Sequence, residues 1–198
     1  MVLTPLSPGQ DLSGPLLSEL TALYASNRAF HRLTGDFPDP DDIRPHQIAE
    51  ALTGELAVPG AEVLLARAGD GRLLGLAITL ARHPDPADPD PWIGLLLVHA
   101  AEQGKGYGRA LAERLEDRLR ARGAAAVRLA VLDNNPAGLA FWTALGYRVL
   151  DHRTDRALGR PCTVLRKPLR VPATRNAAAD PDRTAPPSRH DNAGTGLR

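Results

Sequence analysis

The sequence predicts an α/β domain with a sheet of about seven strands and about four helices. Two observations support this fold class. Short apolar runs bounded by turn residues alternate with longer segments whose leucines recur every three or four positions, as in amphipathic helices. Within residues 92–132, an apolar run, a glycine-rich turn, a helical segment and a second apolar run follow one another. That order predicts two parallel strands joined by a right-handed crossover.

Two helices are expected before the first of the apolar runs. Residues 12–27 carry a helical stripe of leucines, with Ser13 placed to cap the helix and Pro15 in its first turn. Residues 44–56 form a second, shorter amphipathic segment. The polar stretch between them, residues 28–42, is expected to be a long connection.

Six segments have the pattern of strands. The first two flank the sequence AGDG, an Asp-Gly turn typical of a β-hairpin. The third and fourth are continuous apolar runs, which suit strands covered on both faces. The helix between them is expected to end at Gly123, and the next helix, which begins near Pro136, at Gly146. The six segments are residues 61–67, 72–81, 92–98, 126–132, 147–150 and 162–169.

Composition limits the class of protein. Residues 1–169 are predicted to form one domain, whereas residues 170–198 are rich in Pro, Ala, Asp and Arg, so a disordered tail is expected there. The chain has 24 Lys and Arg against 23 Asp and Glu, which gives no electrostatic case for binding nucleic acid. No apolar run approaches the ~20 residues of a membrane span, and the first residues lack a secretory signal pattern. We therefore expect a cytoplasmic protein that does not bind membranes.

The single cysteine, Cys162, excludes an internal disulfide and a zinc site built from cysteines. It lies in the apolar run CTVL, where a small buried hydrophobe is favoured over a nucleophile. No metal is expected.

The stretch EQGKGYGRAL, residues 102–111, places three glycines on alternate positions immediately before a helix. Free backbone amides at a helix N-terminus bind anions, phosphate above all. A Walker A loop is excluded because Lys105 is not followed by Ser or Thr. A Rossmann fingerprint is disfavoured because its third glycine would fall at Arg109, and too little chain follows for a doubly wound sheet. Two interpretations remain. The turn either binds phosphate in a motif of another kind, or it is a glycine-rich surface turn without a ligand.

Two segments resemble the acetyl-CoA signatures of the GNAT acetyltransferase superfamily. Gln103, Gly106 and Gly108 stand at the defining positions of its Gln/Arg-x-x-Gly-x-Gly/Ala motif. The segment NNPAGLAFWTALGY, residues 134–147, is similar to a second signature, in which an Asn leads a helix that ends in Gly-Phe or Gly-Tyr. The resemblance implies a GNAT fold, a mixed and mostly antiparallel sheet whose central parallel pair splays around the cofactor.

The resemblance also implies acetyl-CoA as co-substrate and indicates the residues that hold it. Leu97 and Val98 match the positions that contact pantetheine. Asn135 matches an asparagine beside the cofactor arm, and it also suits a helix cap. Lys105 either adds a charge near the phosphates or is solvated. The predicted pyrophosphate cradle consists of Gln103, Gly104, Lys105, Gly106, Tyr107, Gly108 and Arg109.

The proton chemistry departs from the pattern of the family. Many members protonate the departing thiolate with a tyrosine of the last helix, and Trp142 stands at that position here, so the general acid is unassigned. His83 is a weak candidate for the general base because a histidine titrates in the useful range. Asp85, Asp88 and Asp90 lie in the same proline-rich loop. Water-mediated deprotonation of the amine is the expected arrangement.

In this superfamily the first two helices, their connection and the loop before the fourth strand shape the acceptor pocket. Phe30, Phe37 and Trp92 would supply its apolar wall, and His31 and His46 lie in the same region. The many aspartates of these loops favour a cationic amine. The resemblance thus predicts N-acetyl transfer to a small amine or a peptide by a monomer or homodimer. The alternative is a catalytically degenerate module that binds or senses acyl-CoA.

Overall fold

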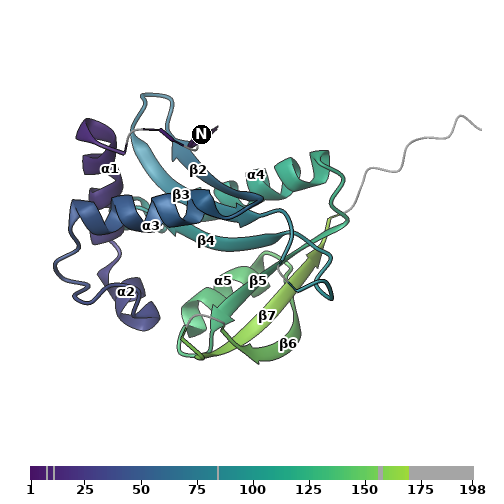
Figure 1. Ribbon diagram of the computed structural model, residues 1–198. Coiled ribbons are helices and arrows are strands. Elements are labelled where there is room, and N and C mark those ends of the chain that lie inside the picture. Colours follow the sequence, from purple (N-terminus) through teal and green to yellow (C-terminus); the bar gives the residue numbers. More distant parts are fainter. Residues whose placement is uncertain (8, 11, 84, 156–157, 170–198) are drawn as a thin grey trace, which may run out of the picture.

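The computed structural model describes residues 1–7, 9–10, 12–83, 85–155 and 158–169, and the predicted tail lies outside them. These residues form a seven-stranded sheet in the order β1-β2-β3-β4-β5-β7-β6 (Figure 1). Neighbouring strands are antiparallel except β4 and β5, which confirms the predicted mixed sheet with its parallel pair. The strands are β1 (Val2–Pro5), β2 (Ala61–Arg67), β3 (Leu73–Leu80), β4 (Trp92–Val98), β5 (Ala126–Leu132), β6 (Arg148–Thr154) and β7 (Pro161–Pro168).

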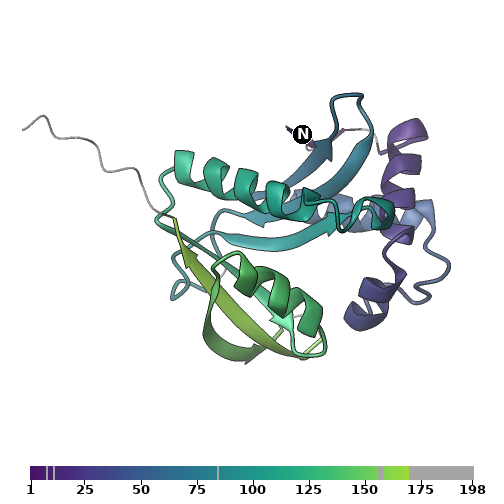
Figure 2. The same ribbon diagram turned by 180° about the vertical axis from the view of Figure 1, so that it is seen from behind.

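Helices cover both faces of the sheet. They are α1 (Gly14–Ala25), α2 (Arg28–Thr34), α3 (Pro45–Ala57), α4 (Tyr107–Ala121) and α5 (Pro136–Ala144). Figure 1 shows α3 in front of the sheet, and the reverse view in Figure 2 brings α4 and α5 to the front. In β2 the side chains alternate between the two cores: Val63 and Leu65 pack with α1 and α3, whereas Leu64 and Ala66 pack with α4. All four are buried, so the central strands need cover on both sides.

Two elements differ from the sequence prediction. Residues 28–34, expected to belong to a connection, form the helix α2. It is too short to show an amphipathic stripe, and it is held by the buried side chains of His31 and Thr34. At the start of the chain, β1 forms an edge strand beside β2, a place where its Pro5 is tolerated. The described residues therefore contain five α-helices, where about four were expected.

The parallel strands β4 and β5 are joined at one position. Trp92 pairs with Arg128, and beyond this pair no further register between the two strands is formed. Toward their C-terminal ends the strands therefore splay apart, as the resemblance implied. Because α4 follows β4 and α5 follows β5, the N-termini of both helices stand at the open end of this wedge.

Buried ion pairs bind the β3–β4 connection to the other half of the sheet. Asp88 bonds Arg128 of β5 and, at 2.8 Å, Arg153 of β6. Asp90 accepts from Arg128 Nε at 2.9 Å and from Arg166 Nε of β7 at 2.8 Å. The hydrogen bond from Arg153 holds the pKa of Asp88 below its ordinary value. Burial acts to raise the pKa of Asp90, but the hydrogen bonds from Arg166 and Arg128 outweigh it and lower that pKa.

Candidate active site

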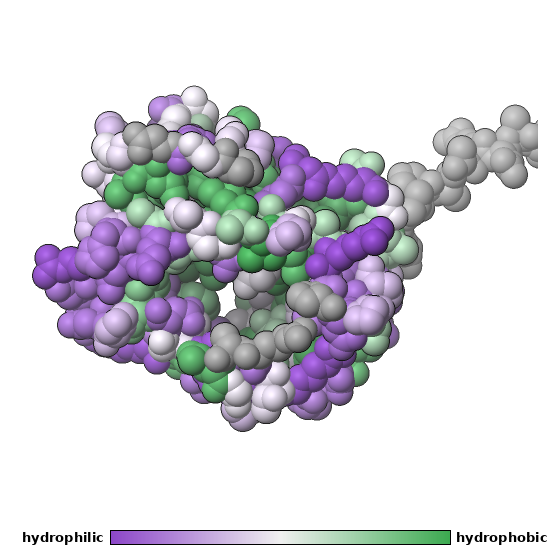
Figure 3. Space-filling view, in the orientation of Figure 1, coloured by the Kyte–Doolittle hydropathy of each residue, from purple (hydrophilic) through white to green (hydrophobic). Residues whose placement is uncertain are grey.

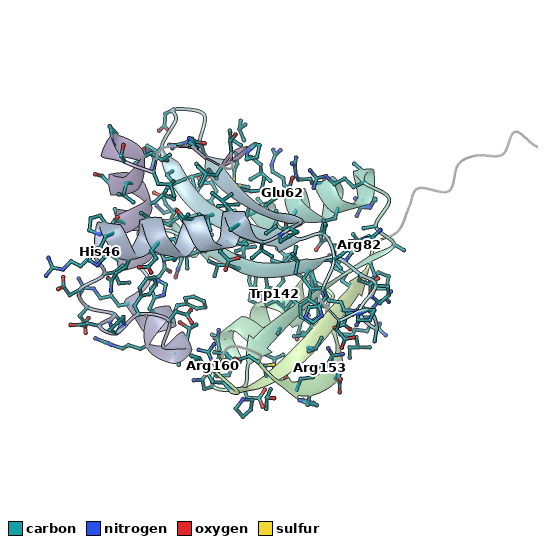
Figure 4. The ribbon with its side chains drawn as sticks, viewed as in Figure 1. His46, Glu62, Arg82, Trp142, Arg153 and Arg160 are labelled. Atoms are coloured by element: carbon teal, nitrogen blue, oxygen red, sulfur yellow. The ribbon has the colours of Figure 1, made fainter. Side chains whose placement is uncertain are left out.

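A cavity of about 700 Å³ opens between the splayed strands. Most of its walls come from α2 and the connection after it, from α3, β4, β5 and α5, and from the connection between β6 and β7, and one residue each comes from α1, β3 and β7. Figure 3 shows the surface hollowed at this place, and Figure 4 shows Trp142 beside the opening and Arg160 at its lower rim. This volume lies within the range of roughly 300–1,000 Å³ that is typical of small-molecule sites.

The glycine turn lies at the open end of β4 and begins α4. Gly104 and Gly106 have φ angles of 75° and 86°, a left-handed conformation that favours glycine, and a Cβ built on either would meet nothing within 4 Å. The hydrogen bond from Ala110 N–H to the Gly106 carbonyl begins the helical ladder. The amides of residues 107–109 therefore have no acceptor within the helix. They offer open donors at the positive end of the helix dipole.

The other residues of the turn have structural contacts. A Cβ on Gly108 would lie 3.4 Å from two ring carbons of Phe141, so this glycine allows α4 to approach α5. The Lys105 ammonium lies 3.1 Å from the Glu102 carboxylate and is 55% exposed. Tyr107 packs against the core beneath α4.

Gln103 anchors the turn instead of offering a free donor. Its backbone N–H donates to the Ala100 carbonyl at 3.2 Å. Its side-chain Nε2 donates to Asn27 Oδ1 at 2.8 Å and to the Val98 carbonyl at 3.1 Å. Asn27 is buried and also donates to that carbonyl, at 3.2 Å. The open amides of the predicted cradle therefore begin after Gln103.

The residues of β4 that line the cavity precede Leu97 and Val98, whose predicted contact with pantetheine stays a prediction. Leu97 and Val98 are buried in the two cores, and neither side chain belongs to the cavity lining. The lining from β4 comes from residues 93–96, in the middle of the strand. Because β5 has moved away there, this stretch presents its edge to the cavity instead of to a neighbouring strand.

The second signature places three of its residues, Asn135, Gly138 and Trp142, on the cavity wall. Asn135 caps α5 through the hydrogen bond from Gly138 N–H to its Oδ1 at 2.9 Å, so the predicted cap is confirmed. Trp142 lines the cavity and packs edge-on against Phe141 and Tyr147, with ring centroids 5.0 Å apart in both pairs. Tyr147 is buried and does not belong to the cavity lining.

The described residues of the proline-rich loop, 82–83 and 85–91, do not line the cavity. His83 Nδ1 lies 3.3 Å from the Asp88 carboxylate, and its ring stacks on Trp92 with centroids 4.8 Å apart. Asp88 and Asp90 are buried against arginines, and Asp85 is exposed. None of these residues is among those that line the cavity. The geometry therefore supports neither His83 as a base nor Trp92 as a wall of the acceptor pocket.

The acceptor side contains the predicted Phe30 and Phe37 and also His31, which the sequence placed in the same region. His31 lines the cavity and is 2% exposed. Asp155 and Arg160 enter from the connection between β6 and β7, where Arg160 Nε donates to Asp155 Oδ2 at 2.5 Å. No local pattern indicates these two residues, because only the strand order β5-β7-β6 brings their connection to the cavity.

The remaining predictions concern single groups. Cys162 is a free, buried cysteine, and burial raises the pKa of its thiol, as suits a packing residue. His46 is exposed, and Figure 4 shows it on α3 away from the cavity.

Among the residues that the structure describes, no group of three or more His, Cys, Asp or Glu side chains is placed to hold a metal. In the same residues no helix is both long and apolar enough to cross a membrane.

A mixed sheet that opens between two central parallel strands, with a glycine turn and a helix N-terminus at the open end, defines the fold of the acetyl-CoA-dependent acetyltransferases. Comparison with known families agrees, because the model of the acetyltransferase (GNAT) family matches residues 22–147. The chain belongs to this family. Members of the family typically use acetyl-CoA.

Individual relatives show how far the likeness extends. The chain is similar to an L-2,4-diaminobutyric acid acetyltransferase from Nocardia farcinica, with 34% identity over 80 residues, and the match covers 40% of each chain. An acetyltransferase structure from Thermus thermophilus has a TM-score of 0.65 at 22% identity and covers 85% of this chain and 96% of its own. The ribosomal-protein-S18-alanine N-acetyltransferase from Escherichia coli has a TM-score of 0.55 at 21% identity, with coverage of 88% and 98%. At these identities the two structures show the shared fold.

Proposed function

We propose that the protein transfers the acetyl group of acetyl-CoA directly to a primary amine of a small molecule or peptide. The observation that carries this proposal is the wedge between β4 and β5, which share one pair and enclose a cavity of about 700 Å³. A second substrate can reach the cavity from the side of α2 and α3, whereas the glycine turn lies at the end of β4. The acceptor amine and the acetyl group of the cofactor would thus meet between β4 and β5.

The residues present fit acetyl-CoA. The amides of residues 107–109 suit its pyrophosphate, and a Cβ built on Gly104 or Gly106 would meet no atom of the described residues within 4 Å. The edge of β4 at residues 93–96 suits the pantetheine amides, because it faces the cavity without a strand partner there. When bound, the cofactor supplies a thioester whose carbonyl carbon accepts an amine. The chain has to orient that amine and take a proton from it.

The similarity to the diaminobutyric acid acetyltransferase supports an amino group on a small molecule as the acceptor. Carboxylates of α3, Glu50 and Glu55, and Asp36 of the α2–α3 connection line the same cavity. They give the acceptor side a negative charge that favours a cationic amine over a neutral one.

A thiol-release assay with acetyl-CoA tests the proposal. The acceptor panel contains L-2,4-diaminobutyrate, a polyamine, an aminoglycoside and a peptide with a free N-terminus. We expect release above the hydrolysis rate with at least one small cationic amine. Tight binding of acetyl-CoA without turnover of any amine would contradict the proposal. It would favour the acyl-CoA-binding module, for which the replacement of the usual tyrosine by Trp142 is the supporting observation.

Gly106→Val tests the pyrophosphate site. We expect acetyl-CoA affinity to fall ten-fold or more, about 1.4 kcal/mol, because the branched side chain would stand over the open amides and would not adopt the φ of 86°. Isothermal titration calorimetry measures the loss. Gly123→Val is the matched control, because Gly123 has the same φ at the other end of α4, again with nothing within 4 Å of a Cβ. Equal affinities in the two folded variants would place the pyrophosphate elsewhere.

A further inference from the structure

His31 is a buried polar side chain, and its only polar neighbours among the described residues are the Tyr24 carbonyl, to which its ring makes no hydrogen bond of good geometry, and the Asp36 carboxylate. Its residue is 2% exposed, and neither ring nitrogen makes a hydrogen bond among the described residues. Its backbone is fully used, since its N–H donates to Asn27 and its carbonyl accepts from Gly35. Buried polar atoms without hydrogen bonds are rare in folded proteins, because removing such an atom from water costs free energy that no partner returns. Because His31 lines the cavity, a bound molecule can supply the missing partner.

Three aromatic rings fix the plane of this imidazole. Tyr24 stacks on it at a centroid distance of 5.5 Å and an interplanar angle of 9°. Phe30 and Phe37 meet it edge-on at 5.3 and 4.9 Å. The ring cannot turn away to find water without breaking these contacts, so its nitrogens stay oriented in the empty protein.

The surroundings keep the imidazole neutral. Burial is the largest influence and lowers the pKa of His31, while the Asp36 carboxylate and a polar contact with the Tyr24 carbonyl act in the opposite direction. Burial raises the pKa of the Tyr24 phenol, an effect to which Glu55 of α3 and Asp36 add, so that phenol stays protonated. A neutral imidazole has one nitrogen that accepts a proton. A nearby carboxylate stabilises the cation that then forms.

We propose that His31 is the general base that removes a proton from the acceptor amine, an inference that rests on the proposed function. The bound ammonium gives one proton to the free ring nitrogen, and the resulting imidazolium is balanced by Asp36. The amine lone pair then forms the N–C bond at the thioester carbon, and the C–S bond breaks. The second proton on nitrogen passes to the thiolate, and His31 returns its proton to water, so that amide, thiol and one proton are the products.

Other groups of the cavity are poorer candidates for this step. Asp155 is held by Arg160 at 2.5 Å, and Arg160 Nη1 also lies 3.6 Å from Asp36. Glu50 and Glu55 are exposed residues of α3. Burial raises the pKa of the Glu55 carboxyl, so Glu55 is the competing base, and a Glu55→Gln variant separates the two. Arg160 Nη1 is also buried without a hydrogen bond, but a guanidinium cannot accept a proton, whereas the imidazole of His31 can.

The test is the pH dependence of kcat/KM from pH 5 to 10, for two amines of different pKa. In the wild type we expect a limb below the ordinary histidine pKa of ~6.5, where His31 loses its proton, and then a plateau up to the pKa of the amine. His31→Gln should lower the plateau by about 100-fold or more. Its remaining rate should rise with pH up to the pKa of the amine, because the free amine must then form without help. His46→Gln, at an exposed histidine of α3, should keep the wild-type profile.

Three outcomes separate the explanations. If the wild type releases thiol with none of the amines, the proposed function itself fails. If wild type and His31→Gln share one profile, only the role of His31 is overturned. If Glu55→Gln removes the plateau and His31→Gln does not, the role of His31 is likewise overturned, and the proposed function stands. Calorimetry should show unchanged acetyl-CoA affinity in His31→Gln, since His31 lies on the acceptor side.

A second measurement needs no variant and so does not depend on whether His31→Gln folds. The ring nitrogens of His31 in the wild type, labelled with ¹⁵N, should change resonance when an amine binds beside an unreactive thioether analogue of acetyl-CoA. A resonance that stays constant at saturating amine would overturn the proposal.

Discussion

Arg128→Ala is expected to lower the free energy of unfolding by about 3 kcal/mol. Arg128 is 11% exposed and pairs with both Asp88 and Asp90, which are themselves 1% and 11% exposed. Its loss leaves two buried carboxylates with fewer partners, and the remaining Arg153 and Arg166 approach from β6 and β7 only. Denaturant unfolding measures the change. Arg148→Ala, at an exposed arginine of β6, is the control and should cost less than about 0.5 kcal/mol.

The same variant should show a defined pH dependence. The folded-state pKa values of Asp88 and Asp90 are lowered, so their contribution to stability is present above the unfolded value of ~3.9 and is lost as pH falls through the folded values. The difference between wild type and Arg128→Ala should therefore be largest above about pH 5 and shrink toward pH 3. A difference independent of pH would show that lost packing, and not lost ion pairing, is responsible.

Gly75→Ala is expected to destabilise the protein by about 3 kcal/mol, at the upper end of the cost of overpacking. A Cβ at this position of β3 would lie 2.4 Å from the backbone oxygen of Leu97 and 3.3 Å from Val98 Cα. Backbone cannot rotate out of the way like a side chain, so the end of β4 has to move. Because the glycine turn follows that end, acetyl-CoA affinity should fall together with stability.

Gly94→Ala is the matched control on the facing strand. A Cβ there would lie 3.8 Å from the Ile78 oxygen, which is ordinary contact, and the stability should change by less than about 1 kcal/mol. Denaturant midpoints and slopes of the two variants give the comparison. Equal losses would mean that β3 and β4 adjust freely at Gly75, and that the close approach has no energetic consequence.

Much of the sheet could be predicted from sequence because its signals are local. Residues 92–98 form a continuous apolar run, which by itself predicts a buried strand. The Asp-Gly turn between β2 and β3 by itself predicts a hairpin. The helix α2 carries too few residues to show a period, and β1 becomes a strand only through its partner β2. Short elements of this kind depend on tertiary contacts that no window of sequence contains.

The residues of the candidate site also fall into two groups, those that the sequence could predict and those that depend on tertiary contacts. The glycine turn and the Asn135 cap were predictable because each is a feature of consecutive residues. His31 carried no such signal, since a histidine in a polar stretch is as often exposed as buried. Its burial follows from Phe37 and Tyr24, which reach it from neighbouring elements. The aspartates of the proline-rich loop suggested an acidic pocket, yet their partners lie on β5, β6 and β7.

The carbonyl of Val98 receives hydrogen bonds from both Asn27 and Gln103, at 3.2 and 3.1 Å. Asn27 stands immediately before the helix that carries His31, and Gln103 immediately before the glycine turn. One backbone oxygen therefore ties the start of α2, whose residues line the cavity, to the start of the glycine turn. A movement of either segment would have to break a hydrogen bond at this junction, so the cavity wall and the N-terminus of α4 keep one relative position.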